Sequence, residues 1–343
     1  MADLWQKLKN LGRPVVLYGM GDGAVRIADR LSAEGVAVSG VMASDGFVRG
    51  QSFLGHTVRR FEDISKQFSN PVVLVCFGSE LPDVIQTVRA IPCEKYFPDV
   101  PVIGEGCFDY AFYKAHQTEL VAAKQTLSDE LSRALFDTAI NFKLSGKEQY
   151  LFENLSTEQE IFDLLNLSQD ERFLDLGAFT GDTAQRFIKA AQNYQSITAV
   201  EPDPKTYKRL QTALDGCQNI TTINAAVGDT VTEIDFYCGG GRSSKQGVLG
   251  AKKVKKIPQI TVDSLKTAFT YIKMDVEGGE KAAITGAREL IAARRPKMKI
   301  ACYHRPQDIF DIILTVKAIC PDYRVYLRRT ECIPFWNFDA IFI

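Results

Sequence analysis

The chain has 343 residues, of which 45% are hydrophobic and 24% charged, and its formal net charge is −1. This composition is typical of a folded protein with room for two domains, and the balanced charge argues against nucleic acid or an anionic membrane as the main partner. No run approaches the roughly 20 apolar residues that span a bilayer, and the N-terminus lacks the apolar core of a signal peptide. Eight cysteines without a C-x-x-C pair predict reduced thiols and a cytoplasmic location.

The first part of the chain predicts a small Rossmann-like α/β domain over residues 1–107. Residues 14–35 read as a strand, a glycine turn and a helix, and further apolar strands follow at 36–44 and 71–79. Such alternation is typical of parallel βαβ units in a doubly wound sheet. Prolines and glycines before residue 107 indicate the domain boundary.

Residues 108–168 have apolar residues at helical spacing, which predicts a helical connector that packs on a second domain. The second domain, 169–343, is predicted as α/β with a mostly parallel, seven-stranded, doubly wound sheet. Its strands are expected at 172–177, 197–202, 220–227, 271–276, 297–303, 324–330 and 338–343. A strand and a flexible loop are expected at 232–247, where Arg242 and Ser243 are candidates to close over a substrate, and the basic cluster at 252–256 is expected to be a solvated edge or loop.

A carboxylate stands directly before the glycine turn of the second domain, in "FLDLGAFTGD". Gly177, Ala178 and Gly181 let a ligand approach the backbone, and the helix that begins at Asp182 offers free N–H groups. Asp175 would repel the pyrophosphate of a dinucleotide, whereas it would attract the ammonium and sulfonium groups of S-adenosylmethionine. The turn therefore favours S-adenosylmethionine as the ligand.

A second acid ends the next strand. Glu201 follows the turn by about 20 residues, the spacing expected of a carboxylate that holds ribose hydroxyls. The alternative is a glycine turn that serves packing alone.

The segments "FLDLGAFTGD", "AVEPDP", "INAAVGD", "ITVDSL", "YIKMDVEGGE" and "KIACYH" stand in an order that resembles the FkbM family of S-adenosylmethionine-dependent methyltransferases, over about residues 148–343. The resemblance implies the class I methyltransferase sheet, with a final antiparallel hairpin, and methyl transfer to oxygen on a small molecule such as a sugar. It also implies that Asn224 and Ala225 lie near the adenine and that Tyr150 touches the methionine end. Asp275, at the end of its strand, could position the sulfonium, the substrate or His304. The cofactor set is Asp175, Gly177, Ala178, Gly181, Asp182, Glu201, Asn224, Ala225, Asp275 and Tyr150.

The catalytic candidates are Asp275, Glu277 and His304. Asp275 and His304 end successive strands, which places them on one edge of the sheet if the strands are neighbours. Histidine titrates near neutrality, so His304 is the first choice for the general base that deprotonates an alcohol. Glu280 is interpreted as an acid that stabilises a helix start. Alternatively, Asp275, Glu277 and His304 hold a divalent cation such as Mg²⁺.

The first domain carries "YGMGDGA", which matches G-x-G-x-x-A and predicts a second nucleotide site at Gly19, Gly21, Ala24 and Asp45. The expected acid is poorly placed, because Ser44 stands at the strand end and Asp45 after it. The passage that follows is similar to the nucleotide-sugar-binding domains of bacterial sugar acetyltransferases. A module for homodimerisation or substrate presentation is the alternative.

These patterns predict a small-molecule O-methyltransferase that acts on a sugar, a nucleotide-sugar or a related metabolite. Two other functions remain open: an NAD-dependent oxidoreductase that uses the first glycine turn, and a non-catalytic module that binds S-adenosylmethionine. Nucleic-acid methylation is disfavoured, because the sequence has neither an Asn/Asp-Pro-Pro-aromatic motif nor a basic stripe.

Overall fold

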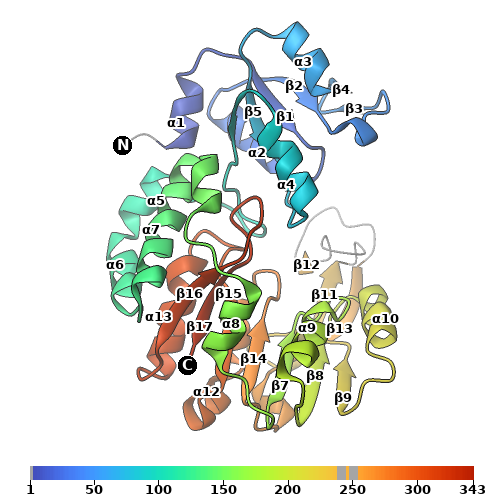
Figure 1. The fold of residues 1–343 in the computed structure, drawn as a ribbon, viewed down its shortest axis with the longest axis vertical. Coiled ribbons are helices and arrows are strands. Elements are labelled where there is room, and N and C mark those ends of the chain that lie inside the picture. Colours follow the sequence, from blue (N-terminus) through green and yellow to red (C-terminus); the bar gives the residue numbers. More distant parts are fainter. Residues whose placement is uncertain (1–2, 238–244, 247–253) are drawn as a thin grey trace.

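A computed structural model describes residues 3–237, 245–246 and 254–343. Figure 1 shows two α/β units, one above the other, with a group of helices along one flank. Arg242 and Ser243, the predicted substrate loop, lie outside the described residues, as do Lys252 and Lys253 of the basic cluster. No helix within the described ranges is long and apolar enough to cross a membrane.

The first unit is a sheet with the strand order β3-β4-β2-β1-β5-β6. Its central strands are parallel, since β1 pairs in parallel with β2 and with β5. The strands are β1 (Val15–Tyr18), β2 (Val38–Met42), β3 (Ser52–Phe53), β4 (His56–Arg59), β5 (Val72–Val75) and β6 (Glu94–Tyr96). The helices are α1 (Leu4–Lys9), α2 (Asp22–Ala33), η1 (Asp45–Phe47), α3 (Phe61–Gln67) and α4 (Pro82–Ala90). The predicted Rossmann-like arrangement is confirmed.

The connecting segment is helical. Its elements are α5 (Tyr110–Ala115), α6 (Gln117–Gln125), α7 (Glu130–Ser145), η2 (Glu148–Phe152) and α8 (Glu158–Leu165). Asp129 caps α7 by accepting from the backbone N–H of Ser132, and Gly146 ends the helix in the left-handed conformation that glycine favours. The side chain of Ser132 in turn accepts from the N–H of Leu327, so α7 is fixed to the edge of the second sheet. The three-part division 1–107, 108–168 and 169–343 stays a prediction.

The second unit is a seven-stranded sheet with the order β16-β17-β15-β14-β7-β8-β9. Its strands are β7 (Arg172–Leu176), β8 (Ser196–Val200), β9 (Ile220–Ile223), β14 (Tyr271–Met274), β15 (Lys297–Ala301), β16 (Val325–Arg329) and β17 (Phe338–Phe342). Its helices are α9 (Asp182–Ala191), α10 (Pro204–Ala213), η3 (Asp263–Leu265), α11 (Glu280–Thr285), α12 (Arg288–Arg294) and α13 (Asp308–Ile319). β17 is antiparallel to both of its neighbours and the other pairings are parallel, which confirms the predicted class I methyltransferase sheet.

A further small sheet was not predicted from the sequence. It joins β10 (Ala226–Val227), β11 (Thr232–Tyr237), β12 (Lys245–Gln246) and β13 (Val254–Ile260). β11 pairs antiparallel with β13 along the whole of β11. β13 begins with exposed, lysine-rich residues and contains Pro258, so its sequence lacks the apolar pattern that marks a buried strand.

The two units are joined along the carboxyl ends of their sheets. Ser79, after β5, and Ile333, between β16 and β17, exchange both backbone hydrogen bonds, at 2.7 and 2.9 Å. After β6, the N–H groups of Val102 and Ile103 both donate to the carbonyl oxygen of His304. The strand ends at which each unit would bind ligands therefore face one another.

Candidate active site

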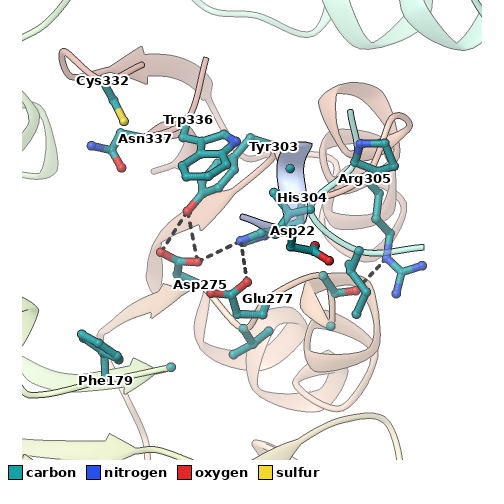
Figure 2. Close-up of a pocket in the computed structure, with 18 of the residues that line it drawn as sticks. Asp22, Phe179, Asp275, Glu277, Tyr303, His304, Arg305, Cys332, Trp336 and Asn337 are labelled. Atoms are coloured by element: carbon teal, nitrogen blue, oxygen red, sulfur yellow. Dashed lines mark hydrogen bonds and ion pairs between the residues drawn. The ribbon is translucent and has the colours of Figure 1, made fainter. Parts of the chain in front are cut away.

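A cleft of about 1070 Å³ lies between the two units. Its walls are the loops that follow β1, β5 and β6 in the first unit and β7, β8, β9, β14 and β15 in the second, together with the β16–β17 loop. Figure 2 shows its centre, with Asp275 and Glu277 below Tyr303 and His304 and with Asp22 of the first unit nearby. Most of the predicted cofactor-binding and catalytic residues therefore line this one cleft.

The turn after β7 forms one wall of this cleft. Gly177 has a φ of +74°, and a Cβ there would lie 1.8 Å from the carbonyl oxygen of Asp275, so only glycine fits. Gly181, also at positive φ, is the N-cap of α9 and leaves the first N–H groups of that helix without a side-chain cap. Gly177 and Asp182 line the cleft, whereas Ala178 is buried and builds the turn behind them.

Asp175 does not line the cleft, which corrects the sequence-based placement. It is fully buried, and Oδ1 lies 3.2 Å from Nζ of Lys273, its neighbour across β7 and β14. Burial raises the pKa of Asp175 and is opposed by the charge of Lys273. The carboxylate is therefore matched by an internal lysine rather than offered to a cationic ligand.

Glu201 lies where a ribose-binding acid was expected. It borders the cleft, with Oε2 accepting from the N–H of Phe179 at 3.0 Å and Oε1 from the N–H of Asp203 at 2.9 Å. Burial raises its pKa to about 7. Each carboxylate oxygen keeps a lone pair for a further donor such as a hydroxyl.

Of the three residues Asn224, Ala225 and Tyr150, which the family resemblance assigned to the cofactor site, only one lines the cleft. Ala225 lines the cleft. Asn224 lies behind it and donates from Nδ2 to the carbonyl oxygens of Glu201 and Pro202, which fixes the turn after β8. Tyr150 packs against the hydrophobic core from η2 and is not part of the cleft wall, so the structure does not bring it to the site.

The catalytic candidates meet at the ends of β14 and β15, which are adjacent parallel strands. Nε2 of His304 lies 3.3 Å from Oδ1 of Asp275 and 4.0 Å from Oε2 of Glu277. The hydroxyl of Tyr303 lies 3.4 Å from both oxygens of Asp275. The side chains of Asp275 and Glu277 are 37% and 36% exposed, so these two carboxylates are the groups that a bound molecule can reach.

His304 is not placed to act as the resting base. It is 1% exposed, and burial, which lowers its pKa, is outweighed by Glu280, Asp275 and Glu277, which raise it to about 10. At neutral pH the imidazole is therefore a cation among carboxylates. This arrangement favours a role for His304 in compensating charge over the role of general base that the sequence suggested.

The sequence suggested that Glu280 only stabilises the start of a helix, but in the structure it also contacts His304. It is 1% exposed, Oε1 lies 3.0 Å from Nδ1 of His304, and the same oxygen accepts from the N–H groups of Val276 and Gly278. Glu280 thus ties the loop after β14 to the imidazole.

A cation site is geometrically open in the same cluster. Asp275, Glu280 and His304 offer one ligand atom each within 4.8 Å of one another. The sequence suggested Asp275, Glu277 and His304, and in the structure Nε2 of His304 does face Asp275 and Glu277. Because the imidazolium already balances these carboxylates, a divalent cation stays a prediction.

The residues predicted for a second nucleotide site are divided between the cleft and other positions, and that site stays a prediction. Gly21 lines the shared cleft, whereas Ala24 is buried inside α2. Asp45 lies in η1, where its carboxylate is 78% exposed and 3.8 Å from Arg60, away from the cleft. A Cβ on Gly19 would lie 3.1 Å from Phe77, so packing accounts for that glycine.

Several wall residues carried no signal in the sequence. Trp336 and Asn337 come from the β16–β17 loop, and Phe77 and Glu80 come from the loop after β5. These loops lie more than 250 residues apart in the chain, so no local pattern connects them. The sequence shows a tryptophan shortly before the last strand, but that Trp336 lines the cleft follows only from the tertiary structure.

Comparison with known proteins decides the family. The model of the methyltransferase FkbM domain matches residues 175–329, which includes the turn after β7 and the His304 cluster. Residues 175–329 thus form an FkbM methyltransferase domain. The match supports methyltransferase activity with S-adenosylmethionine as the methyl donor. A search of curated proteins finds no match.

Solved structures extend the likeness to the whole chain. The methyltransferase FkbM of Methylobacillus flagellatus KT shares 20% identity over 96% of this chain and 90% of that chain, with a TM-score of 0.72, so the FkbM protein and this chain share both units of the fold. The precorrin-6y C5,15-methyltransferase of Geobacter metallireducens GS-15 shares 14% identity over 55% of this chain and 90% of that chain, with a TM-score of 0.34. Aeropyrum pernix fibrillarin, in complex with S-adenosyl-L-methionine, shares 16% identity over 51% and 67%, with a TM-score of 0.32.

Proposed function

We propose that this FkbM-family protein transfers a methyl group from S-adenosylmethionine to a hydroxyl oxygen of a small molecule. The observation that carries the proposal is the position of the Asp275–Glu277–His304 cluster in the same cleft as the turn after β7. S-adenosylmethionine would supply the methyl group as an electrophile on a sulfonium, and in-line displacement depends chiefly on alignment.

The turn after β7 and Glu201 are proposed to hold the donor. Gly177 and the uncapped start of α9 suit its carboxylate, Glu201 suits its ribose hydroxyls, and Ala225 leaves space for the adenine. The walls near Asp275 carry carboxylates, which suit its positively charged end.

Asp275 is proposed to receive the hydroxyl of the acceptor. It is the reachable carboxylate that His304 and Tyr303 both contact, and its pKa is held low, chiefly by the charges of Lys273 and His304 against the effect of burial. The oxygen gains the methyl group, the proton passes to Asp275 and then to water, and S-adenosylhomocysteine leaves. His304 acts as a positioning residue that fixes Asp275 and compensates its charge.

The test uses the full chain with labelled S-adenosylmethionine and small hydroxylated acceptors or a small-molecule cell extract. Label in small molecules, with Asp275→Asn reducing the rate about 100-fold or more, supports the proposal, since a positioned proton acceptor contributes at least that much. Label found only on protein or nucleic acid would overturn the acceptor class.

Two measurements separate the other functions. S-adenosylhomocysteine is expected to raise the thermal midpoint by mass action, and NAD is not; the reverse pattern would favour an NAD-dependent oxidoreductase. If the wild type binds S-adenosylhomocysteine but transfers no label to any acceptor, the non-catalytic module is the better description.

A further inference from the structure

An aromatic wall stands beside the proposed hydroxyl-binding carboxylate. The ring of Trp336 lies 6.4 Å from that of Tyr303, centroid to centroid, at 26° between their planes. Tyr303 in turn reaches Asp275 with its hydroxyl group (Figure 2). Trp336 is half-buried and borders the cleft, so part of its indole can contact a molecule bound there.

The first unit completes this wall. A Cβ on Gly78 would lie 2.0 Å from the ring of Trp336, so the backbone of the loop after β5 rests directly on the indole. Nδ2 of Asn337 donates to Oε2 of Glu80 at 3.3 Å. Together with the paired hydrogen bonds of Ser79 and Ile333, these contacts make residues 77–80 and 332–337 one surface built by both units.

A buried arginine holds the second of these loops in shape. Arg329 is fully buried and donates to the carbonyl oxygens of Cys332 and Pro334 within the loop and to that of Leu151 in η2. Its guanidinium also lies 4.2 Å from the ring centroid of Phe335. The loop that carries Trp336 is therefore held in place by contacts with the protein interior.

The charges of the cleft are unsuited to phosphate. Within the described ranges, carboxylates outnumber lysines and arginines along the walls, and three of those four cations are paired with a carboxylate. The partners are Asp175 for Lys273, Asp22 for Arg26, Asp182 for Arg186 and the carbonyl of Gly278 for Arg305. A phosphorylated molecule would bring further negative charge to Asp275, Glu277 and Glu80.

We propose that residues 77–80 and 332–337 form a composite acceptor subsite that selects an uncharged, polyhydroxylated molecule. Its apolar face stacks on Trp336, and its hydroxyls donate to Glu80 and Asp275. This gives the first unit a role in choosing the acceptor and makes Glu80 a specificity residue. The inference rests on the proposed methyl transfer, because that function makes Asp275 the place where a hydroxyl must lie.

The binding test uses the chain's own fluorescence. The sequence has two tryptophans, and Trp5 is buried in α1, so Trp5→Phe leaves Trp336 as the reporter. With S-adenosylhomocysteine present, methyl glycosides of glucose, galactose and mannose are titrated beside the corresponding sugar 6-phosphates. The subsite is supported if a neutral glycoside gives a saturable change in fluorescence and binds at least ten times more tightly than the corresponding 6-phosphate. Stronger binding of the phosphates, or no saturable change with either set, would overturn it.

Variants test the contribution of the first unit. Glu80→Gln is expected to weaken the affinity of that glycoside about tenfold or more, because a hydrogen bond to a charged group is worth about 1.5–3 kcal/mol. Asp83→Asn is the matched control: it removes the same charge from the exposed start of α4, outside the cleft, and is expected to change nothing. An unchanged affinity in Glu80→Gln would remove the first unit from acceptor recognition.

A separate measurement distinguishes failure of the composite subsite from failure of the proposed methyl transfer. Stabilisation by S-adenosylhomocysteine reports the donor site, which contains neither Glu80 nor Asp83. If that stabilisation is absent in the wild type, the proposed methyl transfer fails; if it is present and Glu80→Gln has no effect on glycoside affinity, only the composite subsite fails.

Discussion

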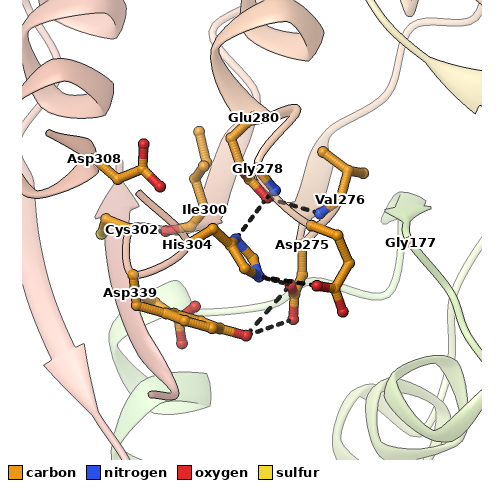
Figure 3. A network of polar contacts seen from close by, with 12 residues as sticks. Gly177, Asp275, Val276, Gly278, Glu280, Ile300, Cys302, His304, Asp308 and Asp339 are labelled. Carbon is orange, nitrogen blue, oxygen red and sulfur yellow. Dashed lines mark hydrogen bonds and ion pairs between the residues drawn. The ribbon is translucent and has the colours of Figure 1, made fainter. Parts of the chain in front are cut away.

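Nδ1 of His304 lies 3.0 Å from Oε1 of Glu280, and both side chains are only 1% exposed. On its other side, Nε2 of His304 faces Asp275, as Figure 3 shows, so the imidazole bridges a buried and a reachable carboxylate. A buried charge persists when it is paired. The pair explains why this histidine holds its proton and why it serves Asp275 better as a cation than as a base.

The first prediction is a pH–rate profile that is flat near neutrality and falls on the alkaline side. Carboxylates raise the pKa of His304 to about 10, so the imidazolium is intact below that pH and is lost as the pH rises through it. Glu280→Gln removes the largest raising cause, so the alkaline limb should move to lower pH by about 1–3 units. The measurement is kcat against pH at saturating substrates.

Glu289→Gln is the control for that variant, because Glu289 is exposed on α12 and its removal should leave the profile in place. A wild-type rate that climbs tenfold per pH unit between pH 6 and pH 8 would show instead that a neutral His304 is required. Equal losses of kcat at every pH in Glu280→Gln would point to a merely structural role.

The second prediction concerns Glu201 and the donor. Its pKa is raised to about 7, and the ionised form is the better acceptor for ribose hydroxyls, so affinity for S-adenosylhomocysteine should improve between pH 6 and pH 8. Glu201→Gln should bind about tenfold more weakly at pH 8 and lose most of this pH dependence. Calorimetric titration at several pH values measures both effects. A pH-independent wild-type affinity would contradict the assignment.

Much of the site could be predicted from the sequence because it follows from local patterns. An apolar strand, a glycine turn and a helix place Gly177 at the carboxyl end of a parallel strand, and the acids at the next strand ends follow by the same rule. Asp275 and His304 met as expected because β14 and β15 are neighbours in the sheet order.

The rest depended on contacts between residues distant in the chain. Asp175 was taken for a ligand residue because the sequence does not show that Lys273 stands opposite it, 98 positions later. Glu280 resembled an ordinary helix-start acid until the fold brought it against His304. Trp336 meets Gly78, and Asn337 meets Glu80, only through the joining of the two units, which no periodic pattern encodes.

The third prediction tests the buried pair of Asp175 and Lys273. Asp175→Asn or Lys273→Met alone should lower the free energy of unfolding by about 3–5 kcal/mol, because each leaves one buried charge uncompensated. The double variant should recover part of that loss. Denaturant unfolding of the wild type and the three variants measures these differences in the free energy of unfolding. Additive losses would show that the two side chains do not act as a pair.

The fourth prediction concerns the cation alternative. The proton on His304 already offsets the surrounding carboxylates, so dialysis against EDTA should leave the rate of methyl transfer within about twofold of the untreated enzyme, in contrast to enzymes that depend on a Lewis acid. Added Mg²⁺ or Mn²⁺ should then have no effect. A loss of tenfold or more that Mg²⁺ restores would show that the enzyme depends on a divalent cation, for which the cluster around His304 is the candidate site.

The fifth prediction concerns Arg329, the fully buried arginine behind Trp336. Burial lowers its pKa to about 10, and its guanidinium donates to three backbone carbonyls that lose this donor once it is removed. Arg329→Ala should therefore lower the free energy of unfolding by about 3 kcal/mol or more. Arg324→Ala, an exposed position just before β16, should stay within about 0.5 kcal/mol of the wild type. Denaturant unfolding compares them, and a loss in Arg329→Ala no larger than the control's would show that the loop keeps its shape without the arginine.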